Sequence, residues 1–515
     1  MAGEQATKTK PRRLLFPQLI VAFVCALAAI SCGMGTGHSM VLIPRLQQND
    51  STIPIDDEIG SWIASIYYIG VPIGNVIGGS LTDILGRRMM LRLSQLPCIL
   101  SWILLASAQS YQVVIATRLV SGIARGMVVD SVVVLMDEHS DVHLRGALYM
   151  QAITSYVVGI LIITGIGTVL EWRTTAGIAV IFPIAVLVGT LAVPETPIWL
   201  VRKGKTHIAS SVLEKAWGKH QNVEAKRELE SIISRCRKET ILLKVFLRPH
   251  VIKSFVIAFL LMMLQNCTGV HIIMIYSVDI ISRVRHGSQD LLDEYAVTNI
   301  SGFFRFAVLI FLAWLTLRVR RRIIVLSSAI ASGICLLSLG TVVIINSKSK
   351  NISERAESWI VISLIFLYIA ANTGGIFALP ASLVGELIPS KIRGLASGVI
   401  FAVNEVAMGG LLKSYPLMLK TMGVHGMFWL FGFFSLLFAL FVFLFVPETH
   451  NHTLAQVEEY FQGHNILWQN RPKDFRKEKS LQQQLITPHN TPDMSQSNTT
   501  VYIKLRGREL SESQC

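Results

Sequence analysis

The sequence predicts an all-α membrane protein, with twelve transmembrane helices arranged as two six-helix bundles related by pseudo-symmetry. Composition is the first reason, because 52% of the residues are hydrophobic and only 16% are charged, against about 25% charged in soluble domains. Segment length is the second, because the apolar blocks of about 20 residues suffice to cross a bilayer core. The third is a charge motif that occurs twice, as Glu138 with Arg145 and as Glu386 with Arg393, which indicates duplicated halves.

The first six predicted spans are separated by short polar turns. An acidic loop follows the first span, a Gly-Arg-Arg turn at residues 86–88 follows the second, and the motif of Glu138 and Arg145 follows the fourth. Pro194 and Glu195 follow the sixth. The predicted spans of this half are 15–41, 61–82, 90–109, 112–137, 146–170 and 174–193.

The last six predicted spans repeat this plan. A basic turn at residues 318–322 separates the eighth and ninth spans, and the motif of Glu386 and Arg393 separates the tenth and eleventh. Pro447 and Glu448 follow the twelfth, as Pro194 and Glu195 follow the sixth. The predicted spans of this half are 250–282, 294–317, 322–346, 357–385, 395–418 and 424–446.

Basic residues occupy alternate loops, which predicts the orientation of the spans. They precede the first span and follow the second, sixth, eighth and tenth, whereas the loop after the first span is acidic. This bias places both termini in the cytoplasm, and we expect the plasma membrane as the location. The net charge of +14 is therefore a topology signal, so membrane lipid is the expected partner and nucleic acid is not. The basic residues are Lys8, Lys10, Arg12, Arg13, Arg87, Arg88, Arg202, Lys203, Lys205, Arg318, Arg320, Arg321, Arg322, Lys391 and Arg393.

The same pattern divides the chain into five parts. A charged segment with helical periodicity separates the two halves, and we expect it to form a few amphipathic helices. The residues after about 465 are polar and are expected to be largely disordered. The parts are a cytoplasmic tail (1–13), the first bundle (14–194), the linker (195–249), the second bundle (250–447) and a cytoplasmic C-terminal tail (448–515).

Neither an enzyme nor a cofactor is expected. The seven cysteines are scattered, without the spacing of a metal site or of a disulfide framework, and no nucleophile motif or phosphate-binding loop occurs. The first apolar block is too long for a cleavable signal peptide. Asn49 and Asn351 begin glycosylation sequons in predicted outer loops. No oligomeric state is predicted.

Short motifs occur in a fixed order between residues 14 and 460. In this order they resemble the sugar porter family of the major facilitator superfamily, and Gly60-Ser61-Trp62-Ile63 resembles its branch of insect facilitated trehalose transporters. The resemblance implies the major facilitator fold, with a central cavity between the bundles, and transport of a small polar solute such as trehalose or a hexose. The motifs are Gly79 to Arg88, Arg118 with Gly122 and Gly126, Glu138 with Arg145-Gly146, Pro194 to Leu200, Gln265 with Thr268 and Gly269, Glu386 with Pro389 and Arg393-Gly394, and Pro447 to Leu454.

The charges of these turns are the predicted gate. Charges at neighbouring helix ends can pair in one state of a carrier and separate in the other, which alternating access requires. The alternative interpretation is that they only set the topology. The predicted gating residues are Asp83, Arg87, Arg88, Glu138, Arg145, Glu195, Glu386, Arg393 and Glu448.

Amides and aromatic faces are the groups that bind sugars, and several stand at the family's sugar positions. Helical spacing would place Gln265, Thr268 and Tyr276 on one face. The chain also departs from the family, because Ile153 replaces a glutamine and Glu405 replaces a tryptophan. The predicted solute-binding residues are Gln265, Asn266, Thr268, His271, Tyr276 and Asn404.

Several charges fall within predicted spans, outside the family pattern. Such a charge costs roughly 2.5–3.5 kcal/mol at the bilayer centre, so it normally faces a cavity or a partner. Arg125, Asp130 and Glu405 are candidates for the solute pathway, as is Arg305. The alternatives are structural pairing or a position near the interface.

The sequence therefore predicts a facilitator that works by alternating access. The first span lacks the aspartate of proton-coupled sugar porters, and His38 stands near that position. A lone membrane histidine such as His38 or His271 is more often a packing residue than a proton relay. Two alternatives remain open: a carrier of a different, charged solute, and a receptor on the same fold that does not transport.

Overall fold

A computed structural model describes residues 13–48, 52–141, 144–218, 222–238, 248–284, 294–316, 318–349, 354–389, 392–449 and 460–461. The chain divides into two compact units, Met1–Trp468 and Gln469–Cys515, and every described residue belongs to the first. The sequons at Asn49 and Asn351, the N-terminal tail before residue 13 and the C-terminal tail after residue 461 lie outside the described residues.

The first bundle contains six spans, of which the sixth is interrupted. Pro183 lacks the N–H that would bond to the carbonyl of Ala179, so the sixth span is built from two short helices. The second helix begins with a cap in which the Asp56 carboxylate accepts from the N–H of Ile59 at 2.7 Å. The helices are α1 (Leu15–Leu46), α2 (Asp57–Leu85), α3 (Arg87–Ala106), α4 (Tyr111–His139), α5 (Arg145–Val169), α6 (Trp172–Ala179) and α7 (Ile181–Gly189).

Glycines let the helices of the first bundle approach closely. A Cβ atom at Gly122 of α4 would lie 2.0 Å from the carbonyl oxygen of Tyr67 on α2. A Cβ atom at Gly159 of α5 would lie 2.1 Å from the carbonyl oxygen of Ile30 on α1. Small residues at such crossings replace side-chain packing by backbone contact, as is typical of membrane helices.

The second bundle contains the other six spans, several of them broken. The seventh and tenth are interrupted, and Gly423, with φ 64° and ψ 179°, divides the last helix between the two spans predicted there. In the tenth span, Pro380 follows a π-turn. Proline has no backbone N–H, so one hydrogen bond of the regular α-helix cannot form at this point. The elements are α11 (Pro249–Cys267), α12 (Val270–Ile275), α13 (Ser277–Val284), α14 (Glu294–Leu315), α15 (Arg321–Ser349), α16 (Glu354–Asn372), the π-turn (Thr373–Phe377), α17 (Leu379–Leu387) and α18 (Arg393–Phe445).

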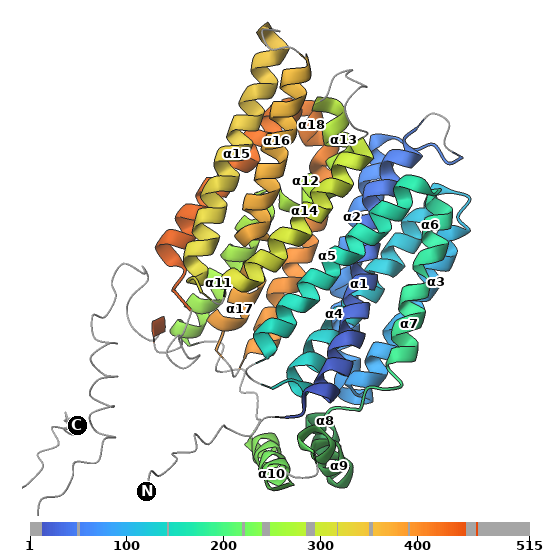
Figure 1. Cartoon of the computed structure of the whole chain (residues 1–515), viewed down its shortest axis with the longest axis vertical. Helices are drawn as coiled ribbons and strands as arrows, with labels where there is room; N and C mark the ends of the chain where they lie inside the picture. The colour runs from blue at the N-terminus through green and yellow to red at the C-terminus, as the bar shows by residue number, and fades with distance from the viewer. Residues whose placement is uncertain are drawn as a thin grey trace, which may run out of the picture. The chain divides into compact units, whose positions relative to one another are not determined.

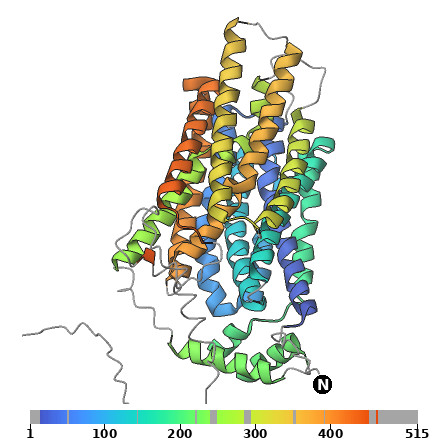
Figure 2. The same ribbon diagram turned by 60° about the vertical axis from the view of Figure 1, so that its left-hand side comes forward.

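The twelve predicted spans are confirmed. In the described part of the chain, eleven helical segments are long and apolar enough to cross a membrane, and the last of them, Gly394–Phe445, contains both the eleventh and the twelfth predicted spans. Figures 1 and 2 show the first bundle, in blue to teal, beside the second, in yellow-green to orange. Helix α2 packs against α18 and α5 packs against α14, so these two pairs form the boundary between the bundles.

The linker forms helices α8 (Pro197–Arg202), α9 (Thr206–Trp217) and α10 (Asn222–Lys238). They pack on one another through a small apolar cluster that includes Leu213 and Ile232. Arg13 ties them to the first bundle, because it pairs with Glu228 of α10 and donates to the carbonyl of His139 at the end of α4 at 2.8 Å. Figure 1 shows these helices at the end of the first bundle where α4 ends.

Candidate functional site

Glu138, from the first copy of the charge motif, forms a buried ion pair with Arg87 at the end of α4. The Arg87 guanidinium, on a residue only 4% exposed, donates to the Glu138 carboxylate from Nη2 at 3.1 Å and from Nε at 3.3 Å. It also contacts the more exposed Asp83 at 3.2 Å. These three residues join the ends of α2, α3 and α4. We call this end of the bundles, with the turns at residues 83–88, 138–145 and 386–393, the motif end.

Glu195 stabilises the same turn from the segment after the sixth span. Its carboxylate accepts from the backbone N–H groups of Arg87 and Arg88 at 2.9 and 3.2 Å, where the positive end of the α3 dipole favours an anion. The Arg88 side chain donates to the carbonyls of Thr190 and Leu191 at 3.0 and 3.2 Å. Gly86, with φ 102°, allows the reversal between α2 and α3.

The second copy builds the corresponding pair in the other bundle. Glu386 of α17 pairs with Arg321 at the start of α15, and Glu448 is buried after the twelfth span. Sequence reasoning did not assign this role to Arg321, although it opens the ninth span as Arg87 opens the third. The side chains of Arg145 and Arg393 lie outside the described part, so their pairing with the two glutamates stays a prediction.

A charge pair also joins the two bundles halfway along their helices. Arg125 of α4 donates to both carboxylate oxygens of Glu405 on α18, at 3.1 and 3.2 Å. Both side chains are largely buried, at 15% and 17% exposure. Such a two-bond fork is the strongest arrangement of an arginine and a carboxylate. The pairing interpretation therefore holds for these two residues, and the pair spans the boundary where the solute pathway was predicted.

Tyrosines surround Arg125 on the side of the first bundle. The rings of Tyr67, Tyr68 and Tyr156 lie 5.7, 5.4 and 6.0 Å from its guanidinium carbon. Their π-faces favour the cation. Asp130, further along α4, contacts neither Arg125 nor another cation among the described residues; its Oδ2 would lie 3.5 Å from a Cβ atom at Gly78.

Two of the predicted amides, Asn266 and Asn404, contact each other, and Gln265 precedes Asn266 on the same helix. Asn266 Nδ2 of α11 donates to Asn404 Oδ1 of α18 at 2.9 Å, one residue before Glu405. Gln265 Nε2 donates to the carbonyl of Ile376 in the π-turn at 2.7 Å. The carbonyl oxygens Gln265 Oε1 and Asn266 Oδ1 are buried and receive no hydrogen bond from any described residue.

The prediction that Gln265, Thr268 and Tyr276 share one helical face is wrong. Helix α11 ends at Cys267, and Gly269 adopts φ 75° before α12 begins, so the regular spacing stops. Thr268 Oγ1 donates back to the carbonyl of Gln265 at 2.6 Å instead of facing a cavity. The break also redirects the chain so that Tyr276 Oη donates to the carbonyl of Leu412 at 3.2 Å.

Two predicted histidines lie in different surroundings. His271 follows the break and its ring lies 6.2 Å from that of Phe377, with Nδ1 buried and unpaired among the described residues. His38 is fully buried within the first bundle, with Nε2 3.3 Å from the carbonyl oxygen of Trp172 and its ring edge-on to Trp102. The environment of His38 is that of a packing residue.

At the end opposite the motif end, a polar cluster of the second bundle surrounds Asp279. Tyr415 Oη donates to Asp279 at 2.6 Å, Arg283 Nε donates to it at 2.9 Å, and Tyr276 stacks on Tyr415 with centroids 3.9 Å apart. Burial lowers the pKa of Arg283, but the hydrogen bond and charge of Asp279 outweigh burial and raise that pKa above its ordinary value.

Beside this cluster, Lys413 links the two bundles. Its Nζ lies 3.1 Å from Ser61 Oγ and 3.7 Å from a carboxylate oxygen of Glu58, both on α2, and over the ring of Trp62 at 4.4 Å. The sequence analysis missed Lys413 and Tyr415, because neither belongs to a repeated motif. The pairs Arg125–Glu405 and Lys413–Glu58 thus cross between the bundles. At the motif end, the pair of Arg87 with Glu138 and the pair of Arg321 with Glu386 each lie within one bundle.

Comparison with known proteins places these features in a family. The model of a protein family described as "Sugar (and other) transporter" matches residues 25–461. A facilitated trehalose transporter of Polypedilum vanderplanki is 28% identical over 456 residues, which cover 87% of this chain and 89% of that protein. A facilitated trehalose transporter of Apis mellifera ligustica is 28% identical over 463 residues, which cover 88% of this chain and 90% of that protein.

Solved structures agree in fold. The xylose transporter XylE from E. coli, in a partially occluded inward open conformation, superposes with a TM-score of 0.70 at 19% identity, covering 85% of this chain and 99% of XylE. XylE bound to 6-bromo-6-deoxy-D-glucose gives 0.69 at 20% identity, covering 86% and 99%. The family match covers most of the chain, and it agrees with the twelve spans in two bundles and with the duplicated charge turns. This membrane protein therefore belongs to the sugar (and other) transporter family.

Proposed function

We propose that this protein carries a sugar across the plasma membrane by facilitated diffusion. The observation that carries the proposal is the pair of buried carbonyl oxygens on Gln265 and Asn266, which receive no hydrogen bond from the part of the chain that the structure describes. Buried acceptors are normally satisfied, and the hydroxyl groups of a sugar supply donors. Asn404 and His271 would complete the site from α18 and α12. The names of the relatives make trehalose or a hexose the solutes to test first.

Transport would proceed by alternating access of the two bundles. In the conformation described above, the bundles are held together halfway, by Arg125 with Glu405, and at one end, by Lys413 with Glu58 and Ser61. We propose that this end faces outward and that these contacts must separate for a solute to enter from outside.

The gate at the motif end would use the charged turns. Arg87 with Glu138, and Arg321 with Glu386, would hold the helix ends of each bundle rigid, so that the bundles rock as units. We assign the gate to the charges predicted from the sequence together with Arg321. The gating set is Asp83, Arg87, Arg88, Glu138, Arg145, Glu195, Arg321, Glu386, Arg393 and Glu448.

The orientation follows from the basic loops. Arg87, Arg88, Arg202 and Arg321 follow spans that end at the motif end, which makes this the cytoplasmic side and leaves both termini in the cytoplasm. Proton coupling is not expected, because His38 is used in packing against Trp172 and Trp102.

The test is uptake by the purified full chain in proteoliposomes. Labelled trehalose, glucose and xylose are supplied outside, with and without the same unlabelled sugar preloaded inside. Accelerated exchange of at least one sugar, at a rate that does not depend on an imposed proton gradient, is the expected result. Saturable binding without uptake would identify a receptor, and neither binding nor uptake of any sugar would refute the proposal.

A further inference from the structure

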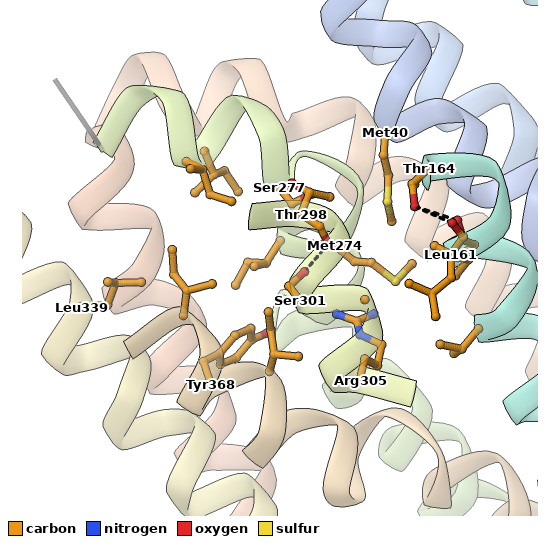
Figure 3. A pocket seen from close by; sticks show the side chains of 18 of the residues that line it. Met40, Leu161, Thr164, Met274, Ser277, Thr298, Ser301, Arg305, Leu339 and Tyr368 are labelled. Atoms are coloured by element: carbon orange, nitrogen blue, oxygen red, sulfur yellow. Dashed lines mark hydrogen bonds between the residues drawn. The ribbon is translucent and has the colours of Figure 1, made fainter. Parts of the chain in front are cut away.

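A second candidate site lies between the bundles, apart from the amides. A cavity of about 40 Å³ is lined by α1 and α5 of the first bundle and by α12, α13, α14, α15, α16 and α18 of the second. None of the six solute-binding residues predicted from the sequence lines it. The polar side chains around it are Thr164, Ser277, Thr298, Ser301, Arg305 and Tyr368, and Figure 3 shows them around one space.

Arg305 is the charged member of this lining. Arginine keeps its charge in proteins, and a mid-membrane charge requires a partner. Arg125 at the boundary of the bundles pairs with Glu405, but Arg305 makes no ion pair or hydrogen bond with any described residue. The ring of Phe377 lies 5.5 Å from the guanidinium carbon of Arg305. A ring face offsets only part of the desolvation of a cation.

Hydroxyl groups that line the same cavity as Arg305 have hydrogens left to donate. Tyr368 Oη accepts from Asn372 Nδ2 at 3.3 Å, so its own hydrogen is available. Thr298 Oγ1 donates to Ser277 Oγ at 3.5 Å, which leaves the hydrogen of Ser277. A guanidinium and hydroxyl donors around a small space can bind an anion, because they offer positive charge and hydrogen-bond donors. The positive charge of the guanidinium repels a cation.

The size and position of the cavity suit a compact anionic group near the amides. Its volume of about 40 Å³ exceeds the space that one water requires. Phe377 connects it to the amides, because its ring faces both Arg305 and His271 and its carbonyl lies 3.4 Å from Gln265 Nε2. A solute held by the amides could therefore extend one substituent toward Arg305.

We propose that Arg305 binds a single monovalent anionic group in this cavity. The group is either the carboxylate of a sugar acid, which would be the transported solute and rests on the proposed function, or a free halide ion beside the sugar. The two sources share one chemistry, a compact negative charge that accepts hydrogen bonds from the guanidinium, Tyr368 and Ser277.

The test measures binding and transport on the same purified full chain. The thermal unfolding midpoint is recorded in a chloride-free sulfonate buffer during titration with glucuronate, with chloride and with glucose. The same preparations in proteoliposomes are assayed for uptake of labelled glucuronate and glucose. The variants are Arg305→Gln, which removes the charge, Arg305→Lys, which keeps it, and Arg318→Gln as the matched control, because Arg318 lies beyond the end of the same helix.

We expect an anion to raise the midpoint of the wild type, of Arg305→Lys and of Arg318→Gln. Arg305→Gln should require at least about tenfold more anion, the effect of one charge-assisted hydrogen bond. A response to glucuronate together with its uptake assigns the anion to the solute. A response to chloride together with uptake of glucose alone assigns it to a free halide.

The proposal is overturned if neither anion moves the wild-type midpoint, or if Arg305→Gln responds to the anion as the wild type does. In either case uptake of glucose would leave the proposed sugar transport intact. Conversely, an anion response that depends on Arg305 in a protein that moves no sugar would refute the proposed function and keep the anion site. If Arg305→Gln does not fold, Tyr368→Phe takes its place, because it removes one proposed donor of the same cavity and keeps the ring. An anion response of Tyr368→Phe equal to that of the wild type would then overturn the proposal.

Discussion

At the scale of single residues, Gln265 and Asn266 use their amide nitrogens for contacts within the protein and keep their amide oxygens available for a ligand. Both amide nitrogens donate to the second bundle, which holds the side chains in place. Both carbonyl oxygens remain without a described donor. An oriented but unsatisfied acceptor is a binding group that needs little reorganisation, because the order of the side chain has already been established by its own protein contacts.

Gln265→Ala should weaken the apparent affinity for the best sugar about tenfold, the effect of one hydrogen bond of about 1–1.5 kcal/mol. The measurement is the concentration dependence of uptake. Gln95→Ala is the matched control, because Gln95 is also a fully buried amide but lies on α3 within the first bundle. Equal affinities for the two variants would place the sugar site elsewhere.

Arg125 and Glu405 illustrate a second residue-scale effect. Removing one partner of a largely buried pair leaves the other charge uncompensated, at a cost of about 3–5 kcal/mol. We expect Arg125→Glu and Glu405→Arg each to reduce uptake strongly, while the double variant, in which the two charges are exchanged, restores part of it. Surface expression and uptake of all four proteins provide a double-mutant cycle. An exchanged pair that is worse than either single variant would argue against the contact.

At the scale of elements, the two bundles differ in how their helices are built. Helices of the first bundle cross in close backbone contact, and several helices of the second bundle are interrupted. Gly122 brings α4 against the backbone of Tyr67, which places Arg125 one turn further on at the boundary with α18. The break at Gly269 and the π-turn after Asn372 direct Gln265 and its acceptor carbonyl toward each other. Packing and local irregularity thus set the position of the pathway residues together.

Gly122→Ala should lower the thermal unfolding midpoint of the purified protein, because the new methyl group would lie 2.0 Å from the Tyr67 carbonyl oxygen and force α2 and α4 apart. Overpacking of this kind costs about 1–3 kcal/mol. Gly165→Ala on α5 is the control, since its Cβ atom would meet nothing within 4 Å. A midpoint for Gly122→Ala equal to that of the control would show that the helices separate without cost.

At the scale of the whole molecule, the contacts between bundles are unequal along the helices. The pair of Arg125 with Glu405 and the contacts of Lys413 join the two bundles, whereas Arg87 with Glu138 and Arg321 with Glu386 act within a bundle. In the proposed cycle, this arrangement corresponds to a carrier closed at the end of Lys413. Rocking would exchange these contacts for contacts at the motif end, where the proposed gate lies.

The orientation of this arrangement has a direct test. Epitope tags in residues 1–13 and after residue 470 should react with antibody only after the plasma membrane is permeabilised, because the basic loops place both termini inside. Surface labelling of a tag in the loop around residues 49–51 should succeed on intact cells. Labelling of either terminus on intact cells would contradict the topology and reverse the assignment of the outer end.

The sequence by itself determined the membrane class, the twelve spans and the duplicated halves. These depend on properties that each segment carries alone, because about 20 apolar residues in a bilayer must satisfy their own backbone as a helix. The family motifs likewise lie in single turns. The sequence also placed Gln265, Asn266 and Asn404 among the polar candidates, since amides within apolar spans are rare enough to single out.

Only the tertiary structure decided which of these residues meet. Arg125 and Glu405 are 280 residues apart, and no local pattern predicts that α4 and α18 face each other at that level. The prediction that Gln265 and Tyr276 share a helical face was wrong, because the left-handed backbone at Gly269 interrupts the helix between them. Partners such as Arg321 for Glu386 and the cavity at Arg305 depend on how helices pack, and packing is a property of the whole bundle and not of one segment.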